Sequence, residues 1–174
     1  MLILHKIAQL SVSRTAWLLL FLSAMSIELA ALYFQYFMEL RPCIMCIYQR
    51  VAVFGIMFSV LPVLLLNNML TRLLAFFGWG LSAIWGLVIA AEHVDIQTAA
   101  NPFFATCEFV PNFPAWLPLH EWLPNIFAAT GDCGDINWSL MDMSMPQWMI
   151  IIFALYSAVW LISLLSRLWV KRGI

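Results

Sequence analysis

Cys43 and Cys46 are separated by two residues and lie shortly before an apolar run from Val51 to Leu66. Cysteines at this spacing can close a small ring that is strained and easily reduced, which suits thiol–disulfide exchange better than bracing. If the following helix already includes Cys46, then Arg50 lies one turn away on the same face. The positive end of a helix and a guanidinium group both stabilise a thiolate. The pattern indicates redox chemistry, and a structural disulfide or half of a zinc site are the alternatives.

The composition of the chain indicates a membrane protein. Of its 174 residues, 64% are hydrophobic and only 10% are charged, and the mean hydropathy is +0.93. In a typical soluble domain, about a quarter of the residues are charged. The formal net charge of −1 gives no basic excess for binding nucleic acid. The four cysteines are an even number, as two disulfides in an oxidising compartment require.

Four apolar segments approach the length of about 20 residues that a helix needs to cross a bilayer. They cover residues 16–33, 51–66, 73–91 and 148–165. The first is longer than the apolar part of a secretory signal, is interrupted by Glu28 and lacks a convincing cleavage site, so we interpret it as an uncleaved span. The sequence therefore predicts an all-α membrane protein, a four-helix transmembrane bundle that forms a single domain over residues 1–174.

The positions of the basic residues predict the orientation of the bundle. Only Arg41 and Arg50 lie in the loops 34–50 and 92–147. The others lie in the two tails and in the short loop between the second and third spans: Lys6, Arg14, Arg72, Arg167, Lys171 and Arg172. Because basic residues concentrate on the cytoplasmic side, we expect both termini in the cytoplasm and the two other loops outside.

All four cysteines fall in the two outward loops, Cys43 and Cys46 in the first and Cys107 and Cys133 in the second. For a protein of the bacterial inner membrane, the outer side is the periplasm, where disulfides persist. Chance placement would put some cysteines in the spans or on the inner side. The shared location therefore favours disulfide chemistry.

The second outward loop is too long for a simple connection. Between residues 111 and 127, prolines are mixed with tryptophans, leucines and polar residues, a composition typical of a short helix in the membrane interface. Such an anchor leaves Cys107 and Cys133 on movable arms, with an exposed disulfide that a thiolate of a partner protein can attack. A disulfide that merely braces the loop is the alternative.

Electrons that reach Cys107 and Cys133 can pass to Cys43 and Cys46 by internal exchange, and from there they need an acceptor in the lipid. The sequence carries no haem, flavin or nucleotide-binding motif. A membrane quinone fits the location, and like a dithiol it exchanges two electrons.

Two polar residues near the outer ends of the spans could act on such a quinone. Arg50 could polarise a quinone carbonyl and stabilise the Cys46 thiolate, or it could simply extend its charge towards the membrane surface. His93 could donate a hydrogen bond to the other quinone oxygen or move a proton, or it could be a polar helix cap.

Glu28 lies inside the first span, where an ionisable side chain is costly and usually has a function. The sequence is compatible with pairing to Gln35, with pairing to a neighbouring helix and with a protonated, uncharged side chain.

Several motifs with these cysteines occur together in one chain. They are Pro-Cys43-x-x-Cys46-x-Tyr-x-Arg50 before the second span, Pro-Phe-Phe-Ala-Thr-Cys107, Gly-Asp-Cys133, and Met-Pro-Gln-Trp148 at the start of the last span. This combination resembles the bacterial disulfide bond formation protein B (DsbB) family over nearly the whole chain. The relay from DsbA through DsbB to quinone, which keeps the bacterial periplasm oxidising, is already established.

The resemblance implies a protein-disulfide:quinone oxidoreductase of the bacterial inner membrane. It implies that ubiquinone, or menaquinone without oxygen, makes the Cys43–Cys46 disulfide, and that Cys107–Cys133 oxidises the soluble thiol oxidase DsbA. In the family, the arginine matching Arg50 is tied to quinone function and the histidine matching His93 lies near the quinone. The chain departs from the family at Gln49, where other members carry glutamate, which puts in doubt a role for charge at that position.

The sequence is also compatible with two hypotheses from other functional classes. One is a non-enzymatic four-helix membrane scaffold with two structural disulfides. The other is a zinc site in which the four cysteines bind the ion tetrahedrally, although an oxidising compartment acts against it. Serine at Cys43 or Cys46 should impair only folding in the first case, and metal analysis tests the second.

Overall fold

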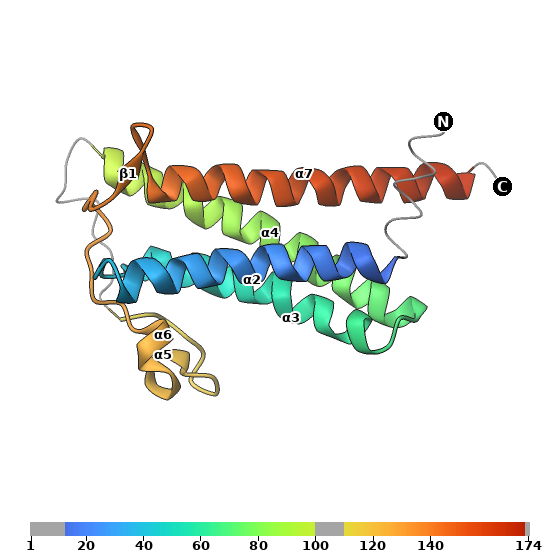
Figure 1. The fold of residues 1–174 in the computed structure, drawn as a ribbon, viewed down its shortest axis with the longest axis horizontal. Coiled ribbons are helices and arrows are strands. Elements are labelled where there is room, and N and C mark those ends of the chain that lie inside the picture. The colour runs from blue at the N-terminus through green and yellow to red at the C-terminus, as the bar shows by residue number, and fades with distance from the viewer. Residues whose placement is uncertain (1–12, 100–109, 173–174) are drawn as a thin grey trace.

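Four long helices carry the apolar segments, and each is long and apolar enough to cross a membrane. The computed structural model describes residues 13–99 and 110–172. The long helices are α2 (Arg14–Tyr36), α3 (Ile44–Leu65), α4 (Met69–Thr98) and α7 (Met145–Arg172). Helix α3 packs against both α2 and α4, and α4 also packs against α7, so the helices form an elongated bundle (Figure 1). The predicted four-helix class is confirmed.

The helices extend beyond the predicted spans at the end of the bundle that carries the cysteines. Helix α3 begins at Ile44 instead of near residue 51, and α4 continues to Thr98 instead of ending near residue 91. A search for apolar segments misses these turns because they contain Gln49, Arg50 and His93, whose side chains are buried against other helices. The polar site thus lies on rigid helical backbone and not in loops.

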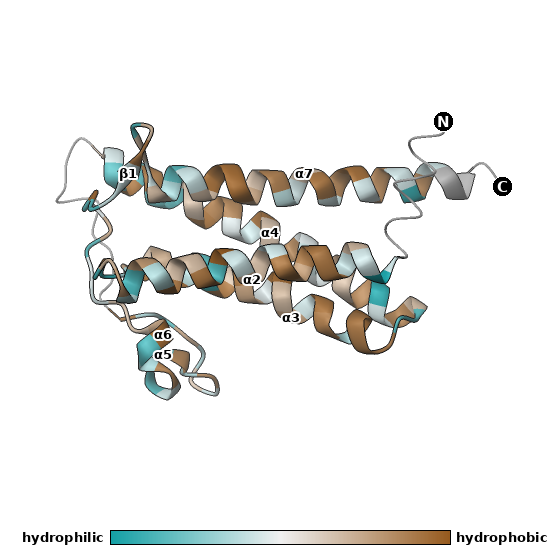
Figure 2. Cartoon of the chain, viewed as in Figure 1, coloured by the Kyte–Doolittle hydropathy of each residue, from teal (hydrophilic) through white to brown (hydrophobic). Residues whose placement is uncertain are grey.

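Hydrophobic residues occur along the length of the long helices (Figure 2). Large apolar side chains such as Leu19, Leu81 and Leu155 are exposed, which is the arrangement expected where lipid replaces water as the solvent. The core between the helices contains Ile56, Ala83 and Phe153, which are fully buried.

Small residues allow the helices to approach closely. Gly55 on α3 faces Ser82 on α4, and Gly86 on α4 faces the ring of Phe153 on α7. Glycine and serine at such contacts are typical of helix pairs in membranes, where close packing replaces the hydrophobic effect between helices.

Replacing Gly86 by alanine is expected to destabilise the bundle by about 1–3 kcal/mol. The added Cβ atom would overlap the buried ring of Phe153, so α4 and α7 would have to separate. Thermal unfolding in detergent measures the effect. Gly134→Ala is the control, because its Cβ would meet only the Asp132 carboxylate, 3.3 Å away. An equal loss of stability in both variants would contradict the close-packing argument.

The second outward loop contains two short helices instead of the single one expected over residues 111–127. These are α5 (Leu119–Trp122) and α6 (Pro124–Phe127). Leu123 between them has a non-helical backbone, because the residue before a proline is disfavoured in the helical conformation. Both helices lie near the end of the bundle where α3 begins (Figure 1). Their location in the membrane interface stays a prediction.

A small hairpin leads the chain into α7. Strands β1 (Ser139–Leu140) and β2 (Met143–Ser144) pair antiparallel, with Leu140 opposite Met143. The two turn residues, Met141 and Asp142, both have positive φ, as the favoured two-residue hairpin turn requires. Trp148 in the first turn of α7 donates a hydrogen bond to the Leu140 carbonyl, which fixes the hairpin to the helix.

Candidate functional site

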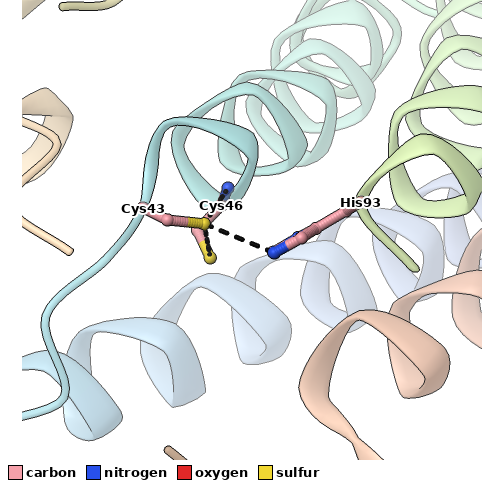
Figure 3. A group of neighbouring side chains, drawn as sticks. All are labelled: Cys43, Cys46 and His93. Atoms are coloured by element: carbon pink, nitrogen blue, oxygen red, sulfur yellow. Dashed lines mark hydrogen bonds between the residues drawn. The ribbon is translucent and has the colours of Figure 1, made fainter. Parts of the chain in front are cut away.

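The two cysteines of the CxxC pair lie at the first turn of α3 (Figure 3). Cys43 is the N-cap of the helix, and its sulfur accepts a hydrogen bond from the backbone N–H of Cys46 at 3.3 Å. Both cysteines are unbonded, and their sulfurs lie 2.8 Å apart. Helix α3 includes Cys46, which meets the condition stated from the sequence, so Arg50 lies one turn further on the same helix.

The two thiols differ in their surroundings. Cys43 is only 3% exposed, whereas Cys46 is half-buried. The hydrogen bond to the Cys46 sulfur, together with burial, raises the pKa of the Cys43 thiol above its usual range. Cys43 therefore keeps its proton at neutral pH when the pair is reduced, and Cys46 is left as the nucleophile.

Iodoacetamide at neutral pH should label Cys46 at least about tenfold faster than Cys43 in the reduced protein, since a buried, protonated thiol is a poor nucleophile. Mass spectrometry of peptides from a quenched time course gives both rates. In Cys46→Ala the thiol of Cys43 loses its sulfur partner, so labelling of Cys43 should become faster than in the unmodified chain. Faster labelling of Cys43 than of Cys46 in the reduced protein would contradict this assignment.

His93 lies against the cysteine pair from the end of α4. Its Nε2 is 3.5 Å from the Cys43 sulfur and its Nδ1 is 3.2 Å from Nε2 of Gln49. The backbone of Cys133 also interacts with the ring, and His93 is only 2% exposed. The sequence suggested a histidine that faces a quinone or caps a helix. In the structure its ring nitrogens contact Cys43 and Gln49, which makes it a direct partner of the dithiol.

Arg50 forms a buried ion pair with Glu28. The Arg50 Nε atom is 2.9 Å from a Glu28 carboxylate oxygen, and both side chains are buried. Arg50 also donates to the Gln35 side chain at 2.9 Å. Of the options left open for Glu28, the structure thus shows pairing to a neighbouring helix, because Glu28 is on α2 and Arg50 is on α3.

The same group of side chains fixes α6 to the bundle. Arg50 donates a further hydrogen bond to the Ile126 carbonyl. The carbonyl of Asn125 accepts hydrogen bonds from Gln35 at 2.8 Å and from the Tyr36 hydroxyl at 2.6 Å. This contact could not be predicted from the sequence, because nothing in a loop sequence shows which of its carbonyl groups meets a distant arginine.

Cys133 lies next to the first cysteine pair. It is disulfide-bonded, only 1% exposed, and packs against Cys43 and Ile44. The expectation of an exposed disulfide on a movable arm is wrong for Cys133, because the loop folds back onto the start of α3. The backbone N–H groups of Thr130 and Gly131 both donate to the Pro42 carbonyl, at 2.9 and 3.0 Å. Cys107 lies outside the described residues.

A cavity of about 290 Å³ lies next to the dithiol, with walls from all four long helices. Its polar walls include Cys46, Arg50, Glu28, Gln49 and His93. The aromatic and apolar walls include Trp138, Trp148 and Met149. Pockets for small ligands begin at about this size, so the polar groups around Cys46 surround a space suited to a small ring.

A second cavity of about 750 Å³ lies between α2, α4 and α7. Its lining is mostly apolar, and Ile27 and Ile152 line both cavities. The polar site therefore adjoins an apolar space that extends along the membrane-spanning part of the bundle.

The fold and the site define a multi-pass helical membrane protein with a dithiol held at one end of its bundle beside a cavity between the helices. The chain belongs to the DsbB family, since residues 13–163 match the family described as disulfide bond formation protein DsbB. A relative from Pseudoalteromonas atlantica, named disulfide bond formation protein B, is 67% identical over 97% of this chain and 98% of its own length. Relatives of the same name from Pseudoalteromonas translucida and Psychromonas ingrahamii are 49% and 51% identical, over 97% and 90% of this chain and 98% and 85% of their own lengths.

Proposed function

We propose that this protein is a membrane thiol oxidase that reoxidises a DsbA-like thiol oxidase of the periplasm and passes the electrons to ubiquinone, or to menaquinone when oxygen is absent. The bundle crosses the bacterial inner membrane with both termini in the cytoplasm and the cysteines on the periplasmic side. The observation that carries the proposal is the cavity wall shared by Cys46, Arg50 and His93, with Cys133 packed against Cys43.

The reaction consists of two thiol–disulfide exchanges and one oxidation. A thiolate of the reduced partner attacks the disulfide formed by Cys133, for which we propose Cys107 as the second cysteine, and the partner leaves with a new disulfide. The resulting dithiol reduces the Cys43–Cys46 disulfide by the same exchange. The Cys43 and Cys46 thiols then give two electrons and two protons to quinone, and quinol leaves. One disulfide is gained by the partner for each quinone consumed.

The position of Cys133 next to Cys43 supports the exchange between the second loop's disulfide and the Cys43–Cys46 pair. Cys133 and Cys43 pack in the same small cluster, and the Pro42 carbonyl binds the backbone just before Cys133. Because Cys43 keeps its proton in the reduced state, Cys46 is the sulfur that acts towards the cavity, which it also lines.

The residues around the cavity fit a quinone. Arg50 carries N–H groups that can bind a quinone carbonyl oxygen, His93 lines the same cavity next to Cys46, and Trp138 and Met149 offer apolar walls to the ring. Quinone supplies a lipid-soluble acceptor for an electron pair. Such a sink is needed, because DsbA has a reduction potential of about −120 mV and is already strongly oxidising.

The scaffold alternative requires both cysteine pairs to act as braces. Cys43 and Cys46 are unbonded, with their sulfurs 2.8 Å apart and a histidine against one of them. A pair that holds loops together has no use for such an arrangement, and it does not explain why charged and polar side chains line a cavity beside the dithiol.

The proposal is tested by mixing the purified protein with a reduced DsbA-like partner and a soluble ubiquinone, and following quinone absorbance and partner thiols together. We expect loss of two thiols for each quinone reduced. A partner supplied already oxidised is the control and should leave the quinone unchanged. Consumption of partner thiols without quinone reduction would overturn the proposed acceptor.

A further inference from the structure

Three metal-binding side chains converge at the start of α3. Among the described residues, the sulfurs of Cys43 and Cys46 and a ring nitrogen of His93 all lie within 4.8 Å of one another. Figure 3 shows His93 reaching the pair from α4. Cys43 and His93 are buried, and Cys46 is half-buried. Two helices thus hold the ligand atoms, and no loop has to fold around an ion.

The ligand types and distances suit a soft divalent ion. Zinc is bound tetrahedrally by thiolates at about 2.3 Å and by imidazole at about 2.0–2.1 Å, which places two sulfurs about 3.8 Å apart and a sulfur and a nitrogen about 3.5 Å apart. The Cys43–His93 distance is 3.5 Å and the two sulfurs are 2.8 Å apart. A rotation of the Cys46 side chain that separates the sulfurs by about 1 Å is therefore sufficient.

The surroundings complete such a site. The Cys46 backbone N–H already donates to the Cys43 sulfur. The Gln49 amide nitrogen lies 3.2 Å from Nδ1 of His93, and when this amide is turned over, its oxygen can accept the Nδ1–H of a metal-bound ring. Outer contacts of this kind orient metal ligands and strengthen binding. Two thiolates neutralise a divalent ion, so the cost of burying its charge is removed. Cys46 and His93 also line the 290 Å³ cavity, from which water can fill a fourth position.

We propose that Cys43, Cys46 and His93 form a site for a soft divalent metal ion of the zinc type, present only when the cysteine pair is reduced. Binding displaces the thiol protons and transfers no electrons, so the dithiol is trapped in its reduced state. In the disulfide form both sulfurs are bonded to each other and supply no thiolate. The inference does not depend on the proposed quinone reaction. It differs from a site of four cysteines, since Cys133 is disulfide-bonded.

The test uses the full-length chain with Cys107→Ser and Cys133→Ser, so that only the pair at α3 can bind. The protein is reduced, freed of reductant without air, and titrated with Co²⁺ and then Zn²⁺. We expect one ion for each chain, a tetrahedral cobalt spectrum with a sulfur charge-transfer band, and displacement of cobalt by zinc. The disulfide form should bind neither ion. An octahedral spectrum, or equal binding by the oxidised form, would overturn the proposal.

Variants separate the three-ligand site from simple chelation by a dithiol. His93→Gln should weaken zinc binding at least about tenfold and remove the tetrahedral cobalt signature. His120→Gln is the matched control, because His120 stacks on Phe113 away from the cluster. Gln49→Leu should weaken binding about tenfold, and Gln49→Glu should strengthen it, because a carboxylate is the better acceptor for the Nδ1–H of a metal-bound histidine.

An unchanged zinc affinity in folded His93→Gln would show that the two sulfurs act alone and would overturn the site. If that variant does not fold, alkylation of the reduced chain decides the question. Zinc should slow labelling of both Cys43 and Cys46 at least about tenfold, and a chelator should restore it. Labelling that zinc does not change would likewise overturn the proposal. All of these measurements are made without quinone, so a failure of the proposed oxidase reaction is detected separately.

Discussion

Replacing Cys46 by serine should reduce the rate of quinone reduction at least about a thousandfold, whether the electrons come from the partner protein or from a small dithiol. Cys46 is the half-buried sulfur of the pair, and it lines the 290 Å³ cavity together with Arg50. Because Cys43 has a raised pKa and is nearly inaccessible, it cannot replace Cys46 as the nucleophile. The loss of a nucleophile commonly removes most of the rate enhancement of an enzyme.

A second variant shows where in the relay the loss occurs. Cys133→Ser should also stop oxidation of the partner protein, but a small dithiol such as dithiothreitol should still reduce the Cys43–Cys46 disulfide and, through it, the quinone. Cys46→Ser should be inactive with both donors. The measurement is quinone absorbance with each donor, with correction for the reaction without protein.

Two results would contradict the assigned order. Substantial quinone reduction by Cys46→Ser with dithiothreitol would place the acceptor elsewhere. A Cys133→Ser variant that still oxidises the partner protein at the normal rate would show that the partner bypasses the second loop. Circular dichroism of both variants checks that the helices remain, since Cys133 is part of a buried cluster.

The long helices were predictable from the sequence because lipid imposes a simple requirement on composition and length. The register of Cys46 and Arg50 was also predictable, since residues four apart on a helix share a face. The helix ends were not, because Gln49 and His93 are polar and are buried only against other segments. Their burial depends on tertiary packing, which hydropathy along one segment does not report.

The contacts between side chains at the site also depend on tertiary packing, so they could not be predicted from the sequence. The partners of Glu28, Arg50 and Asn125 lie on different elements, and many pairings satisfy the same sequence. Gln49 was noticed only as a departure from the family. In the structure, the uncharged amide of Gln49 contacts the His93 ring. It therefore holds the ring in place without adding a charge next to the dithiol.

Breaking the buried ion pair between Arg50 and Glu28 should strongly destabilise the protein. Arg50→Met should lower the free energy of unfolding by about 3–5 kcal/mol, because Glu28 is then left as a buried charge without its partner. For a chain of this size the melting temperature should fall on the order of 10 °C. Glu28→Gln should also destabilise the protein, since it leaves the guanidinium of Arg50 buried without its carboxylate.

The double variant Glu28→Gln/Arg50→Met separates stability from quinone binding. Removing both charges eliminates the unpaired ion, so most of the lost stability should return. Affinity for quinone should not return, because Arg50, the donor that we propose for a charged hydrogen bond to a quinone oxygen, is still missing. Such a bond contributes about 1.5–3 kcal/mol, so KM for quinone should rise about 10- to 100-fold.

Thermal unfolding in detergent and steady-state kinetics at varied quinone concentration measure the two effects on the same preparations. Arg14→Gln is the matched control: it removes one positive charge from an exposed position at the far end of α2, and both quantities should stay unchanged. A double variant as unstable as Arg50→Met would show that the lost stability comes from the contacts of Arg50 with Gln35 and Ile126 and not from the unpaired charge of Glu28. A double variant with normal KM would show that Arg50 supports the helices and does not bind the quinone.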